Sequence, residues 1–248
     1  MVQRIRSCSA KFAGSWLLHT PHTPLTDIEF TTAVRIRLGV PPLPSYTAGG
    51  CPLCNKVADP LHALVCDKIR GAPQGVVLRH DKVCQLIAQF ASSMGCLASC
   101  TNRSDGAKGQ VVPDGVIHTA TKSYMFDATG SHTMSEGYNG MEPEAVLQRR
   151  ATFKVRKYRE HSFLHNCEFV PFTLDTYGLM GTKAVEFAEL LATEQLAFGT
   201  RAPHYLTLSL STFRMELSSI WMKYTCNAIL YHAKQCRATL YKTAIRRV

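Results

Sequence analysis

Two aspartates lie 13 residues apart in this sequence, each within a short apolar run. Asp114 stands within Val111–Ile117, and Asp127 stands within Tyr124–Thr129. A carboxylate in a buried strand is costly unless it is paired or bound to a metal ion. If the two strands form an antiparallel hairpin, the alternation of side chains lets both carboxylates converge on one face. The pair therefore predicts a site for Mg²⁺ or Mn²⁺, which prefer oxygen ligands.

An ion held by these carboxylates would polarise a phosphodiester, lower the pKa of a bound water and balance charge in the transition state. The expected chemistry is phosphodiester hydrolysis without a covalent intermediate. In such sites a lysine usually follows two residues after the second acid, but this position is Thr129. A cation must therefore come from elsewhere. Asp114 also has a simpler interpretation, as a turn acid that follows Pro113.

The helix expected from Pro143 offers that cation. Arg150, Lys154 and Lys157 recur at intervals of four and three residues, which places them in a basic stripe along one side of the helix. Either lysine could reach the site. The alternative is that the stripe is a solvated helix face.

A second group of residues matches the spacing of a zinc knuckle. Its pattern, Cys-x2-Cys-x7-His-x3-Cys, is formed by Cys51, Cys54, His62 and Cys66. Asp59 and Pro60 are suited to begin a helix, which would place His62 and Cys66 on one face. Four such ligands complete the shell of a structural Zn²⁺ and leave no position for a reacting water. The alternative is a helix with buried His and Cys beside an unrelated turn.

Three polar residues open a further expected helix. Asp81 could add a metal ligand, and Arg79 and His80 could contact phosphate. Capping and solvation of the helix start explain these residues equally well. Arg150 and Tyr158 are the other expected nucleic-acid contacts.

The elements that must position these residues can be read from periodicity and turn residues. The patterns predict a helix from Thr26 or Asp27 to Gly39, a helix from Asp81 to near Gly95, strands at Gln110–His118 and Ser123–Ser131, a helix from Pro143, a strand at Cys167–Phe172, and helices towards the terminus. The order helix, strand, strand, helix, strand predicts an α/β fold, with a mixed sheet flanked by helices.

Composition indicates the class of partner. The 248 residues carry a formal net charge of +10. From Arg201 onward the chain has eight Lys or Arg residues and a single acid, Glu216. A nucleic acid is therefore the expected partner. No apolar run is long enough to span a membrane. The scattered cysteines fit a reducing, intracellular setting. The first 26 residues are basic and acid-free, which leaves an organellar transit peptide as an alternative.

Five motifs in order resemble one family. They are the Cys/His knuckle, Arg79-His80-Asp81, Pro113-Asp114, Asp127, and Lys154-x-x-Lys157-Tyr158. They resemble the restriction-like endonuclease region, of the PD-(D/E)XK type, in the polyproteins of site-specific non-LTR retrotransposons. The resemblance covers about residues 26–195. It implies that Asp114 and Asp127 hold the catalytic metal and that the lysine has moved to a helix, ahead of Tyr158.

With this resemblance the chain divides into four segments. They are an N-terminal helical segment (1–45), a zinc knuckle and linker (46–75), a restriction-endonuclease-like domain (76–182) and a basic helical region (183–248). The boundary after the knuckle rests on the glycine- and proline-rich stretch Gly71–Gly75.

Members of the resembled family nick chromosomal DNA so that the freed 3′ hydroxyl primes reverse transcription. The resemblance therefore implies a DNA nickase in the nucleus. This chain has no Tyr-x-Asp-Asp polymerase motif, which leaves three interpretations: a domesticated module, a separately encoded part and a truncated element. A reverse transcriptase is one expected partner. Two alternatives stay open: a catalytically inactive, domesticated nucleic-acid-binding module, and an RNA nuclease. Cutting both strands would call for two active sites and hence a homodimer.

Overall fold

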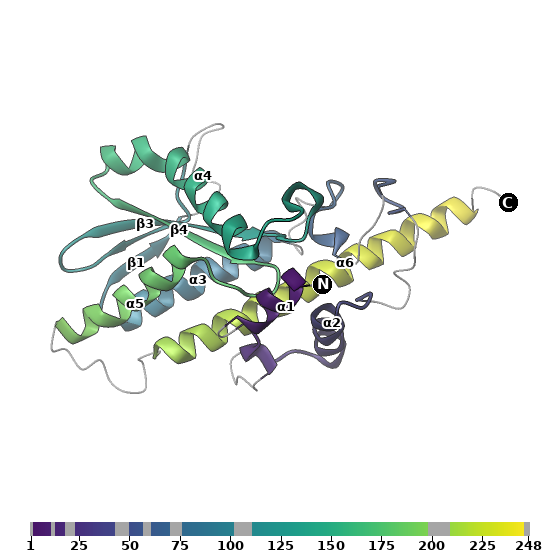
Figure 1. Cartoon of the computed structure of the whole chain (residues 1–248), viewed down its shortest axis with the longest axis horizontal. Coiled ribbons are helices and arrows are strands. Elements are labelled where there is room, and N and C mark those ends of the chain that lie inside the picture. The colour runs from purple at the N-terminus through teal and green to yellow at the C-terminus, as the bar shows by residue number, and fades with distance from the viewer. Residues whose placement is uncertain are drawn as a thin grey trace.

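The computed structural model describes residues 2–10, 13–17, 23–42, 50–56, 61–69, 76–101, 111–197 and 209–245 (Figure 1). Its helices are α1 (Val2–Ser9), α2 (Asp27–Leu38), α3 (Leu78–Ser93), α4 (Pro143–Leu164), α5 (Thr182–Ala197) and α6 (Leu210–Ile245). Its strands are β1 (Leu97–Cys100), β2 (Gly115–His118), β3 (Ser123–Ser131) and β4 (Glu168–Asp175). Short 3-10 turns are η1 (Ser15–Leu17), η2 (His62–Leu64) and η5 (Glu136–Tyr138).

The four strands form one mixed sheet in the order β1-β2-β3-β4. Strands β1, β2 and β3 are antiparallel neighbours, whereas β3 and β4 are parallel and are connected through α4. A parallel pair needs such a crossover, which a helix usually supplies. The expected α/β fold, with a mixed sheet flanked by helices, is therefore confirmed.

The two faces of β3 have different surroundings because successive side chains alternate. Tyr124, Phe126 and Ala128 belong to the main hydrophobic core, to which α3, α5 and α6 also contribute. Asp127, on the opposite face, contacts side chains of α4. Figure 1 shows the sheet between α4 and the layer formed by α3, α5 and α6.

The sheet leaves one edge of β3 open where the two aspartates lie. β2 begins at Gly115, opposite Phe126, so that β3 residues 127–131 extend past the start of β2 while pairing with β4. Asp114 immediately precedes β2, and its backbone N–H still bonds to the carbonyl of Phe126 at 2.9 Å. The end of β2 thus places Asp114 beside an uncovered stretch of β3.

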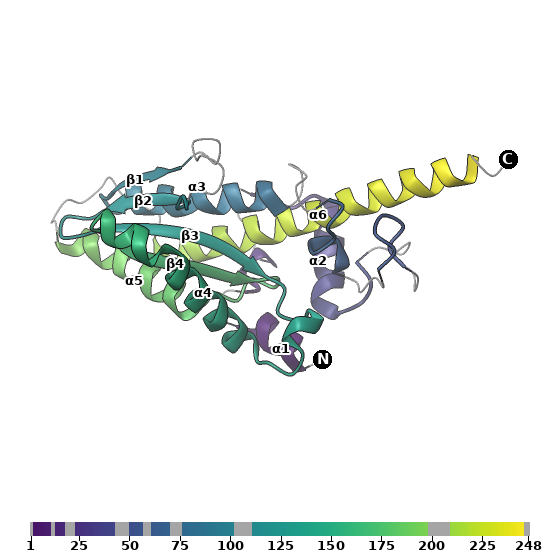
Figure 2. The same cartoon turned by 90° about the horizontal axis from the view of Figure 1, so that it is seen from above.

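Helix α6 is 36 residues long and crosses most of the molecule (Figure 2). Its first half packs Phe213, Leu217 and Trp221 into the main core. Further along, Cys226 and Ile229 join a second core, with side chains of the N-terminal segment. The basic C-terminal segment expected at 183–248 therefore contributes apolar residues to both cores.

Most expected elements are found, with shifted ends. Thr26 caps α2 in a full capping box with Glu29, and Gly39 ends the helix in the left-handed conformation (φ 72°). The hairpin of β2 and β3 and the helix from Pro143 are confirmed. The helix expected from Asp81 begins at Leu78, one turn earlier.

Three expectations about strands require correction. Asp114 was expected within a strand that begins at Gln110, but β2 begins after Asp114, and residue 110 lies outside the described residues. β4 starts at Glu168 and runs three residues past the expected end at Phe172. The four-residue strand β1 was not expected, because its sequence (Leu-Ala-Ser-Cys) lacks the β-branched and aromatic residues that mark a strand. The linker at 71–75 also lies outside the described residues.

At the end of β4, a buried carboxylate holds a turn. Asp175 Oδ1 accepts hydrogen bonds from the backbone N–H groups of Tyr177 and Leu179, both at 2.8 Å. Burial raises the pKa of Asp175 to about 6, although these bonds act in the opposite direction. Asp175 thus stabilises the turn but carries its charge at a cost.

In the part of the chain that the structure describes, we find no helix with both the length and the apolar character of a membrane span.

Candidate functional site

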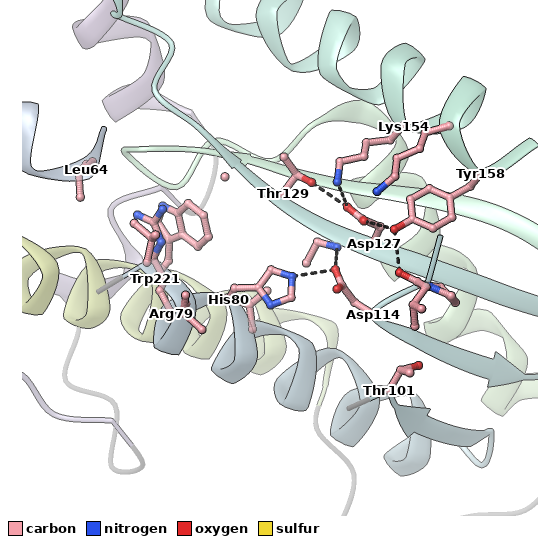
Figure 3. A pocket seen from close by; sticks show the side chains of 18 residues that line it. Leu64, Arg79, His80, Thr101, Asp114, Asp127, Thr129, Lys154, Tyr158 and Trp221 are labelled. Atoms are coloured by element: carbon pink, nitrogen blue, oxygen red, sulfur yellow. Dashed lines mark hydrogen bonds and ion pairs between the residues drawn. The ribbon is translucent and has the colours of Figure 1, made fainter. Parts of the chain in front are cut away.

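A cavity of about 630 Å³ opens at the uncovered edge of β3, between α3 and α4 (Figure 3). We call it the carboxylate pocket. Its lining includes His80, Asp114, Asp127, Lys154, Tyr158 and Trp221. Both aspartates, the helix-borne lysine and the tyrosine of the sequence motif therefore meet in one cavity, although they come from separate elements.

Asp127 is buried at the back of this pocket, where three side chains surround its carboxylate. Lys154 Nζ lies 2.6 Å from Oδ2, and the hydroxyl of Thr129 donates to the same oxygen at 2.8 Å. Tyr158 Oη lies 2.7 Å from Oδ1. Thr129 occupies the position where such sites usually carry a lysine, and here its hydroxyl helps to orient Asp127.

Tyr158, which was expected from the sequence as a nucleic-acid contact, lines the carboxylate pocket and also packs inside the protein. Its ring is buried (1% exposed) and stacks on Phe169, with ring centroids 4.5 Å apart. Its hydroxyl lies between Asp127 Oδ1 and the carbonyl of Val112, which is 2.9 Å away. Tyr158 therefore connects α4 to β3 and to the segment before Asp114.

Asp114 approaches the same stretch of β3 from the other side. Its Oδ2 accepts the backbone N–H of Ala128 at 2.8 Å, and His80 Nε2 lies 2.7 Å from the same oxygen. The other ring nitrogen of His80 lies 3.2 Å from Asp81 Oδ1. His80 thus lies between Asp81 and Asp114. His80 and Asp114 line the pocket, and Asp81 contacts His80 from outside this lining.

The two lysines of the expected stripe differ in their contacts. Both line the carboxylate pocket. Lys154 pairs with Asp127, whereas Lys157 Nζ lies 4.9 Å from the centre of the Tyr158 ring. Lys154 is therefore the lysine of the two that contacts the buried carboxylate, whereas Lys157 is exposed.

Arg79 is held by α6 and is largely buried. Its guanidinium stacks over the Trp221 ring at 4.0 Å and donates from Nη1 to the Thr225 hydroxyl at 2.9 Å. Burial lowers its pKa to about 10, so that it stays charged at neutral pH. Gly130 lets the Trp221 ring lie close to β3, since a Cβ at this position would lie 2.7 Å from that ring. The sequence motif did not reveal this dependence of Arg79 on α6.

A second cavity of about 450 Å³ shares Leu64, Arg79 and Gly130 with the carboxylate pocket. Arg149 and Arg150 line it. The expected basic stripe of α4 thus lines two neighbouring cavities, with Arg150 in one and Lys154 and Lys157 in the other. A polyanion lying along α4 would meet both.

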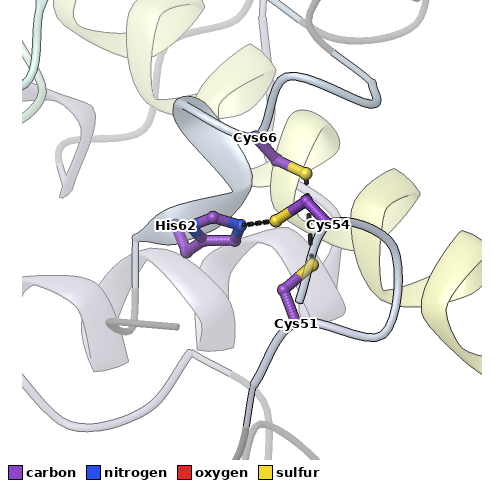
Figure 4. Close-up of side chains that lie close together, drawn as sticks. All are labelled: Cys51, Cys54, His62 and Cys66. Atoms are coloured by element: carbon purple, nitrogen blue, oxygen red, sulfur yellow. Dashed lines mark hydrogen bonds between the residues drawn. The ribbon is translucent and has the colours of Figure 1, made fainter. Parts of the chain in front are cut away.

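The four residues of the knuckle motif lie together (Figure 4). One potential ligand atom from each of Cys51, Cys54, His62 and Cys66 lies within 4.8 Å of all the others. Cys54 Sγ is 3.2 Å from His62 Nε2, and Cys51 Sγ is 4.0 Å from Cys66 Sγ. This Cys/His cluster could bind a metal ion such as Zn²⁺.

The local structure of this cluster differs from the expectation. The helix expected from Asp59 to Cys66 is a single 3-10 turn, η2, with backbone bonds from Leu64 to Leu61 and from Val65 to His62; residues 57–60 lie outside the described residues. So short a segment cannot offset the cost of nucleating an α-helix, and a 3-10 turn is the usual form of such pieces.

The thiols of the cluster sit in different environments. Burial raises the pKa of Cys66 to about 11. Burial also acts to raise the pKa of Cys51, but backbone N–H groups of Leu53 and Cys54 bond to its sulfur, and the net effect is a lowered pKa. Cys51 is therefore the thiol of this pair that the fold favours as a thiolate, the form that binds metal.

Two further potential ligands approach from α6, and the sequence analysis missed both. His232 Nε2 lies 3.4 Å from Cys51 Sγ, and Cys236 lies one helical turn after His232. Their spacing of four residues, the same as that of His62 and Cys66, is the signal that could have identified them.

No protein-family model matches this chain, and comparison with curated proteins finds no match either. The resemblance to retrotransposon endonucleases therefore rests on the residues described above.

Proposed function

We propose that this chain is a metal-dependent DNA endonuclease that hydrolyses phosphodiester bonds and nicks DNA. The observation that carries the proposal is the meeting of Asp114, Asp127 and Lys154 in one open cavity. Asp127 is buried and paired with a lysine, and Asp114 is partly buried in the same open cavity. Such a cluster of charged groups in a cavity is a candidate reaction site. We further propose that the sheet and its helices form a restriction-endonuclease-like fold.

We propose that the catalytic ion in this cavity is a hard divalent cation, because carboxylates are its preferred ligands. Mg²⁺ or Mn²⁺ is usually bound by one or two carboxylates, with water and substrate phosphate completing its shell. Asp114 and Asp127 would supply the carboxylates. When bound, the ion supplies positive charge to the phosphate and lowers the pKa of a coordinated water.

Hydrogen bonds from neighbouring residues hold the two aspartates in fixed orientations. His80 and the N–H of Ala128 orient Asp114, and Tyr158 and Thr129 orient Asp127. Such fixed orientation limits reorganisation during the reaction. The ammonium of Lys154 carries three donors. It can therefore donate to a phosphate oxygen of the substrate while it keeps its contact with Asp127.

The basic side chains of α4 support a nucleic acid as the substrate. Arg149, Arg150, Lys154 and Lys157 line the two neighbouring cavities, and the whole chain carries a net charge of +10. Neutralised phosphates release counterions, which favours binding at low salt. We therefore expect affinity to fall steeply as salt is added.

We also propose that the Cys/His cluster holds a structural Zn²⁺. Cys51, Cys54, His62 and Cys66 would complete a tetrahedral shell, and such closed shells stabilise small lobes. The resemblance further suggests a reverse transcriptase or a second copy of the chain as a partner and the nucleus as the place of action.

The nuclease proposal is tested with purified protein, supercoiled plasmid and structured RNA. Each substrate is incubated with Mg²⁺ or with chelator, and nicked and linear products are separated on a gel. Wild type should nick the plasmid only with Mg²⁺, and Asp114→Ala should lose this activity. Glu168→Gln is the matched control, since Glu168 is an exposed acid that pairs with Lys122 on the surface. It should cut like wild type.

The same experiment separates the alternatives. Binding of DNA without cleavage by wild type, at any tested metal, would favour an inactive binding module over the nuclease. Cleavage of RNA with the plasmid left intact would favour an RNA nuclease. Equal cleavage by wild type and Asp114→Ala would place the activity outside the carboxylate pocket.

A further inference from the structure

Helix α6 brings a second pair of potential ligands to the Cys/His cluster. Cys51, His232 and Cys236 each offer an atom within 4.8 Å of the other two. Cys236 Sγ lies 3.7 Å from His232 Nδ1 and 3.8 Å from Nε2. His232 is almost fully buried (1% exposed), and its ring meets that of His62 edge to face at 5.7 Å.

These distances match those between ligands of one tetrahedral ion. With metal–sulfur bonds of about 2.3 Å, two ligand atoms on the same ion lie roughly 3.5–4 Å apart. The separation of 3.4 Å between Cys51 Sγ and His232 Nε2 is close to this range, as is the separation of 4.0 Å between Cys51 and Cys66. The Cys51 sulfur is thus close enough to share one ion with Cys66 and another with His232.

One ion cannot use every donor in this cluster. The six side chains are Cys51, Cys54, His62, Cys66, His232 and Cys236. A tetrahedral ion accepts four ligands, so two of the six would be left over. The cluster divides into a set of four and a set of three, and Cys51 belongs to both.

We propose that this cluster binds two metal ions of the Zn²⁺ class that share the Cys51 thiolate. The first ion takes the four ligands of the knuckle motif, and the second takes Cys51, His232 and Cys236. A thiolate sulfur has enough lone pairs to bridge two ions. The second ion has three protein ligands, so that solvent or an exogenous ligand takes its fourth position.

The second ion would tie the cysteine-bearing segment to α6. The same helix carries Trp221, which lies under Arg79 in the carboxylate pocket. A metal ion in the second site would therefore fix the segment that carries Cys51 to α6, the helix whose Trp221 lines the carboxylate pocket. This inference extends the proposed four-ligand zinc site, and it does not depend on nuclease activity.

Metal content measured by mass spectrometry on the purified full chain tests the proposal. Wild type, prepared with added Zn²⁺ and freed of loosely bound metal, should hold two ions per chain. The double variant with His232→Ala and Cys236→Ser should hold one. Cys167→Ser is the matched control, because this cysteine bonds to the His165 carbonyl, away from the cluster, and it should hold two.

Cobalt tests whether the two ions share a ligand. High-spin Co²⁺ titrated into metal-free protein should give a paramagnetic resonance signal that grows over the first equivalent and then fails to double with the second, because a bridging sulfur couples the spins. The double variant should take up one equivalent without this loss.

The metal content of wild type by itself tests the second site, so the test does not depend on whether the variants fold. One zinc ion in wild type would overturn the second site and leave the four-ligand site standing. No zinc in wild type would remove both. Two ions in the double variant, or two uncoupled cobalt ions in wild type, would place the second ion elsewhere.

Discussion

Replacement of Lys154 by methionine probes the ion pair at the centre of the carboxylate pocket. Methionine keeps most of the apolar stem but removes the ammonium, which lies 2.6 Å from Asp127 Oδ2. The side chains are 19% and 5% exposed, so the carboxylate would stay buried without its cation. In metal-free protein the variant should therefore be less stable than wild type.

The size of this loss follows from the surroundings. Removal of one partner from a fully buried ion pair costs about 3–5 kcal/mol. Here Thr129 and Tyr158 still donate to the carboxylate, and the lysine was a fifth exposed, so we expect about 1–3 kcal/mol. Lys157→Met is the matched control on the same helix, and loss of its contact with the Tyr158 ring should cost about 1 kcal/mol or less.

Mg²⁺ should reverse much of the loss. In wild type a divalent ion must compete with the ammonium for Asp127, whereas in Lys154→Met it replaces a missing charge. Ligand at about 100 times its Kd adds about 2.7 kcal/mol to the free energy of unfolding. Mg²⁺ should therefore stabilise Lys154→Met more than wild type, although the variant should lose DNA cleavage.

Urea unfolding at low salt, with chelator or with Mg²⁺, measures both effects, since urea does not screen ion pairs as guanidinium does. If Lys154→Met and Lys157→Met lose equal stability without metal, and Mg²⁺ stabilises all three proteins alike, the reasoning about this site is refuted.

Three other changes test separate parts of the structure. Tyr158→Phe keeps the stacked ring but removes a hydrogen bond to the buried Asp127 carboxylate, and urea unfolding should show a loss of about 1.5–3 kcal/mol; a loss below about 0.5 kcal/mol would contradict the contact. Because the pKa of Asp175 is raised to about 6, the folded state holds its proton more tightly, and the stability that this proton confers at acid pH should be lost as the pH rises through 6. The difference in unfolding free energy between wild type and Asp175→Asn should therefore change by about 1–3 kcal/mol from pH 4 to pH 7 and stay constant above it. Cys54→Ser should release zinc to a chelator while hydrogen exchange in β2 and β3 stays slow; rapid exchange there would show that the hairpin depends on the lobe.

The sequence predicted those parts of the site that depend on local spacing. The capping box at Thr26, the β2–β3 hairpin and the helix from Pro143 follow from residues within a few positions of each other. The basic stripe likewise follows from helical periodicity, and it does line the two cavities. A period of two or of 3.6 residues reports the side of its own element on which a residue lies. It left open which lysine of the stripe, Lys154 or Lys157, would reach Asp127.

Only the tertiary structure decided what those surfaces meet. Tyr158 was expected to contact a nucleic acid, and its hydroxyl also bonds to Asp127, because the crossover of α4 brings the ring under β3. Arg79 lies over Trp221, 142 positions away, and His232 lies beside Cys51, 181 positions away. Such contacts depend on how whole helices and strands pack. The local sequence around a residue does not predict a contact with a residue so distant along the chain.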